Sequence, residues 1–392
     1  MFQGFFTPLF IIPRSCIRKI SEQRKEVLQL NDQDYMRMAI ELAQNGAGWV
    51  NPNPLVGAVV VKNDQVIGRG WHTKFGALHA EREALASCVE SPKGSTVYVT
   101  LEPCCHWGKT PPCTQALIEA EVSRVVVGSP DPNPLVAGKG IAQLKEAGIS
   151  VTEGVLEEEC NGVNRVFFHY IQAKTPYVIA KYAMTLDGKI ATKTGASKWI
   201  TSEKARKRAH LDRQRYSAIM VGINTVLTDN PQLTCRLEGK EVKNPLRVVL
   251  DSHLRITPDL QIPRTAHEVP TLIATCCNDE KKIEQLKACG CDVEILPEKE
   301  GSVDLSALMQ CLGTKGIDSV MVEGGATLLW SLFSDHLVNR VQAYIAPKVF
   351  GGKTAPSPVS GEGVELPSQA FLFTKPSVEV LGDDILLECE VK

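Results

Sequence analysis

The chain has 392 residues, of which 43% are hydrophobic and 22% are charged, and its formal net charge is −2. This composition is typical of a globular protein with a sizeable core, and the length predicts two domains of about 100–200 residues each. A nearly neutral chain has no overall basic field to attract nucleic acid, so a nucleic-acid-binding function is disfavoured.

The first 31 residues differ in composition from the rest of the chain. Residues 1–20 are rich in Phe, Leu and Ile, with Arg14, Arg18 and Lys19 after the apolar run and no acidic residue. A secretory signal carries its positive charge before the apolar run, and this run is too short to span a bilayer. We therefore expect an extension over 1–31 with no membrane partner. An organellar transit segment, an unstructured tail and an upstream translation start stay open.

From Asp32 onward, helical and strand patterns alternate. Apolar residues at helical spacing over 36–43 precede Gly46, and residues 56–61 have the pattern of a buried strand. Helices and strands then follow over 80–86, 97–101, 114–120, 125–127, 141–147 and 151–155. A further helical stretch leads to a connection near Lys174-Thr175-Pro176. The sequence thus predicts a layered α/β domain over 32–174 and a second domain over 175–392.

Three candidate metal ligands and a carboxylate lie in the first domain. His79-Ala80-Glu81 precedes an apolar helical run, Cys104 follows the predicted strand over 97–101, and Cys113 precedes a predicted helix. Zinc prefers thiolate and imidazole ligands, and a zinc ion with three protein ligands keeps one position open for chemistry. Such a zinc lowers the pKa of a bound water to roughly 7, and a carboxylate that is not a ligand can carry protons. The expected zinc ligands are therefore His79, Cys104 and Cys113, and Glu81 is the expected catalytic proton shuttle.

The alternative interpretation is that these are ordinary core residues, since free cysteine is often buried and the chain has 13 cysteines. A lone H-x-E is common, but its ordered combination with two P-C pairs is much rarer by chance. Cys105 and His106 could compete as ligands; Cys104 is preferred because it follows Pro103, as in the zinc nucleobase deaminases. The cysteine spacing fits no regular disulfide framework, so we expect a reducing, cytoplasmic compartment.

The spacing of the last two ligands makes a family resemblance specific. The general deaminase signature continues as C-x-x-C, but Trp107 occupies that position here. The segment over 101–113, LEPCCHWGKTPPC, closely resembles the zinc motif of the bacterial riboflavin-biosynthesis deaminase, which is commonly fused to a reductase. The resemblance implies an N-terminal cytidine-deaminase-like three-layer domain. The implied substrate-pocket residues are Asn53, His72, Lys109 and Asn133; by spacing alone these are turn and loop residues.

The second half resembles the reductase of the same family, a dihydrofolate-reductase-like domain that uses NADPH. The matching blocks lie over 181–191, 197–201, 221–231, 233–236 and 322–328. Without the resemblance the signal is weak, because no G-x-G-x-x-G fingerprint is present and Gly324-Gly325 could be a phosphate site or only a tight turn. Arg213 and Arg236 could hold a phosphate or be solvated charges, and Glu323 could meet a sugar hydroxyl or cap a helix.

The resemblance also implies roles for single residues of the second half. The implied NADP contacts are Ala183, Trp199, Thr225, Asp229, Ser252 and Gly325. The implied substrate contacts are Lys181, Ser197, Arg213, Leu233, Arg236 and Glu323. No general acid is assigned in this half, and a homo-oligomer is expected because the family commonly forms one.

Together these features predict a bifunctional enzyme of riboflavin biosynthesis with Zn²⁺ and NADPH as cofactors. The implied reactions are hydrolytic deamination of a diamino-pyrimidinone carrying a ribosylamino 5′-phosphate, and reduction of its ribosyl side chain to ribityl. The partners are then small phosphorylated pyrimidines. Two other functions stay open. A deaminase of nucleosides or nucleic acid is disfavoured by the missing C-x-x-C. A binding or scaffold protein is disfavoured because the motifs in both halves are intact.

Overall fold

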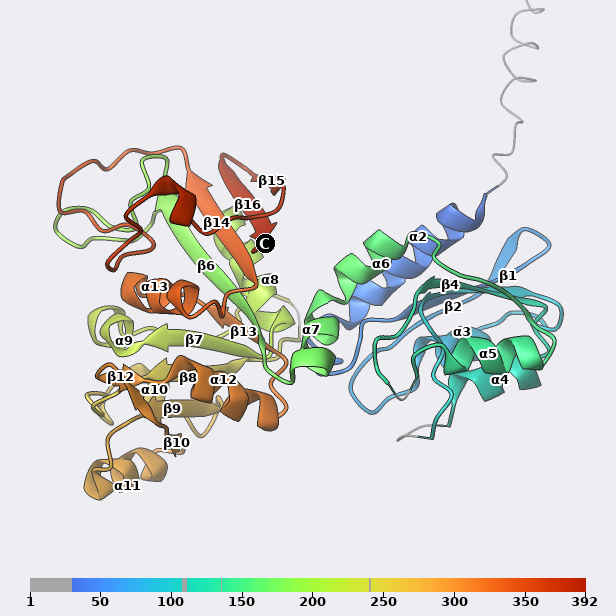
Figure 1. Cartoon of the computed structure of the whole chain (residues 1–392), viewed down its shortest axis with the longest axis horizontal. Helices are drawn as coiled ribbons and strands as arrows, with labels where there is room; N and C mark the ends of the chain where they lie inside the picture. Colours follow the sequence, from blue (N-terminus) through green and yellow to red (C-terminus); the bar gives the residue numbers. More distant parts are fainter. Residues whose placement is uncertain (1–29, 108–110, 135, 240) are drawn as a thin grey trace, which may run out of the picture.

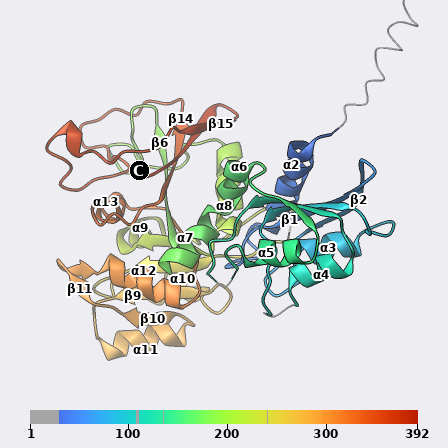
Figure 2. The ribbon, with the colours of Figure 1, turned by 45° about the vertical axis from the view of Figure 1, so that its right-hand side comes forward.

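The structure is a computed structural model that describes residues 30–107, 111–134, 136–239 and 241–392. Most of the predicted extension over 1–31 lies outside these residues. The described chain forms one sheet of five strands, one of nine strands, and a small pair of β11 (Glu298–Lys299) and β12 (Ser302–Val303) (Figure 1). Helices α6 (Glu157–Val163) and α7 (Arg165–Ala173) connect the two larger sheets (Figures 1 and 2). No described helix has both the length and the hydrophobicity needed to cross a membrane.

The first sheet has the strand order β2-β1-β3-β4-β5. Strand β1 (Gly57–Lys62) is antiparallel to β2 (Gln65–Trp71) and β3 (Thr96–Leu101), whereas β3, β4 (Arg124–Ser129) and β5 (Ser150–Thr152) are parallel. Helices α2 (Asp32–Ala43) and α6 cover one face. Helices α3 (Ala80–Ala86), α4 (Cys113–Glu119) and α5 (Lys139–Glu146) cover the other, so the domain has three layers.

The side-chain alternation of β1 explains why both faces are covered. Ala58 and Val60 pack against the helices of one face, and Val59 and Val61 pack against the other. All four side chains are buried, so the strand is a continuous apolar run in the sequence. The start of α2 is fixed by Asn31, whose side chain accepts hydrogen bonds from the amides of the first helical turn.

The second sheet has the order β10-β9-β8-β7-β13-β6-β14-β16-β15. Its parallel strands are β6 (Tyr177–Thr185), β7 (Ala218–Gly222), β8 (Leu246–Leu250), β9 (Thr271–Thr275), β10 (Asp292–Ile295), β13 (Ser319–Val322) and β14 (Arg340–Ala346). Strands β15 (Ser377–Leu381) and β16 (Asp384–Glu390) extend it in antiparallel fashion. The helices of this half are α8 (Glu203–Arg215), α9 (Ile223–Asp229), α10 (Gln261–Arg264), α11 (Glu280–Ala288), α12 (Leu305–Thr314) and α13 (Ala326–Ser334).

The strand order changes direction around β13. This strand comes late in the chain but lies between β6 and β7, which are parallel to it. In open parallel sheets, ligands bind at the carboxyl ends of strands where the order switches. The carboxyl ends of β6, β7 and β13 are therefore the expected site of the second half, and Glu323 directly follows β13 there.

Candidate functional site

The three expected zinc ligands lie together. The atoms His79 Nδ1, Cys104 Sγ and Cys113 Sγ all lie within 4.8 Å of one another. The imidazole nitrogen is 3.5 Å from Cys104 Sγ and 3.4 Å from Cys113 Sγ. A tetrahedral zinc with ordinary bond lengths separates a nitrogen from a sulfur ligand by about 3.5 Å. The donor set and its spacing therefore fit zinc, and among the described residues the competing candidates Cys105 and His106 fall outside this group.

The local fold explains this convergence. His79 is the N-cap of α3, Cys113 is the first residue of α4, and Cys104 follows β3, as the sequence predicts. Arg82 of α3 donates hydrogen bonds to the carbonyl oxygens of Pro111 and Pro112, at 3.2 and 2.8 Å, and so fixes the entry into α4.

The electrostatics of the group suit metal binding and proton transfer. Hydrogen bonds from Cys113 and His79 lower the pKa of Cys104 to about 4, so this thiol is readily a thiolate. Glu81 is 3% exposed and lines the adjoining cavity, and burial raises the pKa of its carboxyl group. A carboxyl group that is not a ligand and lies beside an open metal position can accept a proton and pass it on.

The cavity beside the group has a volume of about 360 Å³, which is within the range of small-molecule sites. Three of the expected substrate residues line it, namely Asn53, His72 and Asn133. Lys109 lies outside the described residues. Nδ1 of His72 is 2.9 Å from the carbonyl oxygen of Leu78, to which it donates, so Nε2 is left to accept from the Asn53 amide at 3.2 Å. Burial lowers the pKa of His72, which favours the neutral ring.

Several residues of the cavity were not predicted from the sequence. Glu102 is 3% exposed and accepts hydrogen bonds from the backbone amides of Gly138, Gly140 and Ile141, which orders the loop that carries Asn133. The position of Glu102 at the end of a predicted strand, just before Pro103-Cys104, is the one signal for it. Helix α7 contributes a wall that no motif indicated: Phe167, Tyr170 and Ile171.

A second polar cluster lies at the carboxyl end of β13. Arg213, in the last turn of α8, donates two hydrogen bonds to Glu323, from Nε to Oε1 at 2.7 Å and from Nη2 to Oε2 at 2.8 Å. Lys181 Nζ of β6 is 3.8 Å from Glu323 Oε2. The side chains of Arg213 and Glu323 are only 15% and 10% exposed, so Arg213 is not a solvated charge. Glu323 does not cap α13 either, because the N-cap is Gly325.

Thr234 joins the other expected arginine to this cluster. Its carbonyl oxygen accepts from Arg213 at 3.0 Å, and its hydroxyl accepts from the exposed Arg236 at 2.7 Å. His210 lies beside them, and burial together with the two arginines lowers its pKa to about 4, so it is neutral at pH 7. The cluster thus presents cationic groups on neighbouring side chains, a chemistry suited to an anionic ligand.

The structure brings only some of the expected cofactor residues together. Gly222 N donates to Gly324 O at 3.2 Å, and Thr225 Oγ1 lies 3.6 Å from where a Cβ on Gly325 would be, so Thr225 and Gly325 are neighbours. Ala183 is two residues from Lys181 on the same face of β6. Asp229 ends α9, one turn after Thr225, whereas Ser252 follows β8 and Trp199 lies in the loop before α8 with the expected substrate residue Ser197. The Leu233 side chain is 4% exposed in the core, which leaves its backbone to contact a substrate.

Comparison with known proteins accounts for nearly the whole chain. Residues 176–387 match the family described as the RibD C-terminal domain, and residues 29–129 match the cytidine and deoxycytidylate deaminase zinc-binding region. The riboflavin biosynthesis protein RibD of Actinobacillus pleuropneumoniae is 53% identical over 92% of this chain and 95% of its own length. The chain belongs to the RibD family. RibD of Escherichia coli K12 is 38% identical over 91% of this chain and 99% of its own.

A solved structure agrees with the whole fold. The diaminohydroxyphosphoribosylaminopyrimidine deaminase/5-amino-6-(5-phosphoribosylamino)uracil reductase of Thermotoga maritima superposes with a TM-score of 0.83 and 39% identity, over 92% of this chain and 99% of its own. The prediction of a cytidine-deaminase-like domain followed by a reductase domain is confirmed. RibD proteins are bifunctional enzymes of riboflavin biosynthesis with a zinc-binding deaminase domain and a reductase domain that uses NADPH, and this chain has both domains.

Proposed function

We propose that the chain deaminates 2,5-diamino-6-(ribosylamino)pyrimidin-4-one 5′-phosphate in its first domain and reduces the ribosyl side chain of the product to ribityl in its second. The observation that carries this proposal is the open three-ligand group with buried Glu81 beside it, at a cavity large enough for a nucleotide precursor. The family supplies the pairing with an NADPH-dependent reductase on the same chain.

In the first domain, His79, Cys104 and Cys113 would hold zinc, which when bound would supply a water of lowered pKa to attack the amine-bearing ring carbon. Glu81 accepts a proton from the attacking water and delivers it to the amine, so that the carbon–nitrogen bond breaks and ammonia leaves. Asn53, oriented by neutral His72, contacts the pyrimidine together with Asn133. Lys109 is assigned to the phosphate group of the substrate.

In the second domain, bound NADPH would supply the hydride, and the residues of this chain bind and orient the two reactants. The paired Arg213 and Glu323, with Lys181 and Arg236 beside them, bind the phosphorylated substrate. Ser197 and the backbone of Leu233 complete this set. The cofactor contacts are assigned to Ala183, Trp199, Thr225, Asp229, Ser252 and the turn at Gly325.

The two proposed activities belong to two domains of the chain. We place the boundary at 174–175, between Lys174, which caps α7, and β6. Residues 1–31 form an extension before the deaminase domain. The functional assembly is proposed to be a homo-oligomer, which light scattering of the purified chain would test.

A two-step assay tests the proposed function. The pathway substrate is expected to release ammonia without NADPH and to oxidise about one equivalent of NADPH when the cofactor is added. Cytidine and a tRNA substrate serve as controls and should release none. Ammonia release from cytidine or tRNA, with none from the phosphorylated pyrimidine, would support a different deaminase instead.

Replacing Cys113 by Ser should lower the zinc content of the purified protein. The substitution removes one of three thiolate or imidazole ligands, and a serine hydroxyl is a much poorer zinc ligand than a thiolate. Metal analysis by mass spectrometry measures the zinc stoichiometry. A matched Cys105→Ser variant should retain zinc; if it loses zinc while C113S keeps it, the ligand assignment must move to Cys105.

A further inference from the structure

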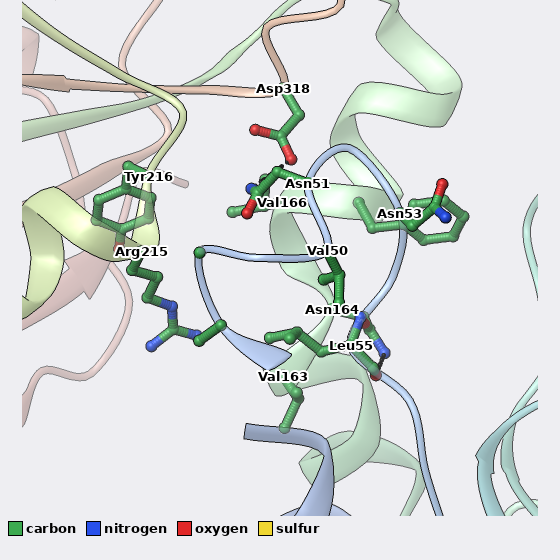
Figure 3. A pocket seen from close by; sticks show the side chains of 13 residues that line it. Val50, Asn51, Asn53, Leu55, Val163, Asn164, Val166, Arg215, Tyr216 and Asp318 are labelled. Atoms are coloured by element: carbon green, nitrogen blue, oxygen red, sulfur yellow. Dashed lines mark hydrogen bonds between the residues drawn. The ribbon is translucent and has the colours of Figure 1, made fainter. Parts of the chain in front are cut away.

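The segment over 51–55 faces both domains at once. Asn53 lines the cavity of the first domain and contacts His72 there, at 3.2 Å. Two residues earlier, Asn51 Nδ2 donates a hydrogen bond of 2.7 Å to Asp318 Oδ2, at the start of β13 in the second domain. Figure 3 shows Asp318 directed at Asn51, with the Asn53 side chain on the other side of the loop. Neighbouring residues of one short loop therefore contact the deaminase cavity and the reductase sheet.

Asp318 is a fixed anchor for this contact. Its side chain is 2% exposed, and its other oxygen, Oδ1, accepts from Ser217 Oγ at 2.6 Å and Ser319 Oγ at 2.7 Å. All three partners hold the carboxylate in one orientation, and hydrogen bonds to a charged acceptor are stronger than neutral ones. The second domain thus offers Asn51 a rigid, charged acceptor.

The far end of the loop is fixed as well. Asn164, which is 2% exposed, accepts from Leu55 N at 2.8 Å and donates to Leu55 O at 2.9 Å. Figure 3 shows Asn164 beside Leu55 below the contact of Asn51 with Asp318. With both ends held, the side chain of Asn53 has a defined position in the cavity.

Another wall of the deaminase cavity also contacts the second domain. Tyr170 of α7 lines the cavity, and its hydroxyl donates to the carbonyl oxygen of Gly313 in α12 at 3.1 Å. The backbones at Gly313 and Lys174 approach each other so closely here that a Cβ on Gly313 would lie 2.0 Å from Lys174 O. This contact is independent of the pair Asn51–Asp318.

We propose that the reductase domain positions the substrate pocket of the deaminase domain, with Asn51 and Asp318 as positioning residues that act through Asn53. The inference rests on the proposed deaminase function and adds to it that the pocket is completed by the second domain. Neither residue touches the zinc ligands or Glu81 in the described structure, so binding of substrate is affected and the chemical step is not.

A charge-swap series in the full chain tests this proposal. Asn51→Asp places two carboxylates against each other and should raise the deaminase KM about tenfold, which corresponds to the loss of one hydrogen bond to a charged group. Adding Asp318→Asn should restore KM to within about twofold, because the introduced amide can donate to the introduced carboxylate while its oxygen still accepts from Ser217 and Ser319. The deaminase kcat, the zinc content and NADPH oxidation should stay near wild type throughout.

A matched control separates positioning from general weakening of the interface. Arg165→Gln breaks another contact between the domains, the 2.8 Å ion pair of Arg165 with Glu390, and neither of these two side chains lines the cavity. Its deaminase KM should not change. A similar rise in KM for this variant, or no rise for N51D, would overturn the proposal. If N51D fails to fold, as loss of NADPH oxidation would reveal, Asn51→Ala replaces it with the same expectation.

Amide hydrogen exchange gives a readout that does not depend on activity. Exchange at Asn53, Leu55 and Val56 should be faster in N51D and return to the wild-type rate in the double variant. Unchanged exchange in N51D overturns the positioning role. If exchange responds as expected but the wild-type chain releases no ammonia, the positioning contact stands and the proposed deaminase function falls.

Discussion

Replacing Glu81 by Gln will abolish ammonia release while zinc content and the reduction of deaminated substrate stay unchanged. The amide has nearly the same shape as the carboxyl group but cannot exchange protons, so transfer from water to the departing amine is lost. General acid–base groups contribute about 10²–10⁴-fold to rate, and the deaminase kcat should fall by that order. Ammonia release, metal analysis and NADPH oxidation on a pre-deaminated substrate measure the three properties separately.

The buried position of Glu81 makes this test selective. The side chain is 3% exposed and is not among the three residues that could hold a metal, so the substitution should leave the ligands in place. Glu83, two residues later and partly exposed on the same helix, provides a control; Glu83→Gln should retain full deamination. Ammonia release at the wild-type rate in E81Q would remove Glu81 from the mechanism.

Much of the first domain was predictable because its signals are local. The helix predicted over 80–86 coincides with α3, and the strand predicted over 97–101 is β3 with one more residue at its start. The apolar run at 56–61 corresponds to β1, which is shifted by one residue to Gly57–Lys62, and it is apolar throughout because both faces of the strand are covered. With these elements in place, a strand end and two helix starts bring His79, Cys104 and Cys113 together.

The remaining features depend on contacts between distant residues. By sequence, Arg213 could have been a solvated charge and Glu323 a helix cap, and their pairing appears only when α8 packs at the end of β13. The contact of Asn51 with Asp318 joins residues in different domains, and an N-P pair in the sequence predicts no more than a turn. Tyr170 likewise reaches the deaminase cavity from a helix with no motif.

The second large effect is expected from Arg213→Ala. Burial raises the pKa of Glu323, but the charges of Arg213 and Lys181 outweigh this and lower it to about 2. Removing Arg213 leaves a nearly buried carboxylate whose remaining cation, Lys181 Nζ, is 3.8 Å away. Breaking a buried pair in this way costs about 3–5 kcal/mol, so unfolding of the reductase domain should be easier. The reductase KM for the phosphorylated substrate should rise, while ammonia release and zinc content stay unchanged.

The stability that is lost in R213A should depend on pH in a way that identifies the Arg213–Glu323 pair as its source. A carboxylate whose pKa is lower in the folded than in the unfolded state stabilises the fold above its unfolded value of 4.5, and this stabilisation is lost as pH falls toward about 2. The difference in unfolding free energy between wild type and R213A should therefore shrink on acidification in this window, as denaturant titrations would measure. Arg213→Lys keeps the charge but not the two parallel hydrogen bonds, so its unfolding free energy should lie between those of wild type and R213A. An unchanged reductase KM in R213A would place Arg213 outside the substrate pocket, and its pairing with Glu323 would then serve stability alone.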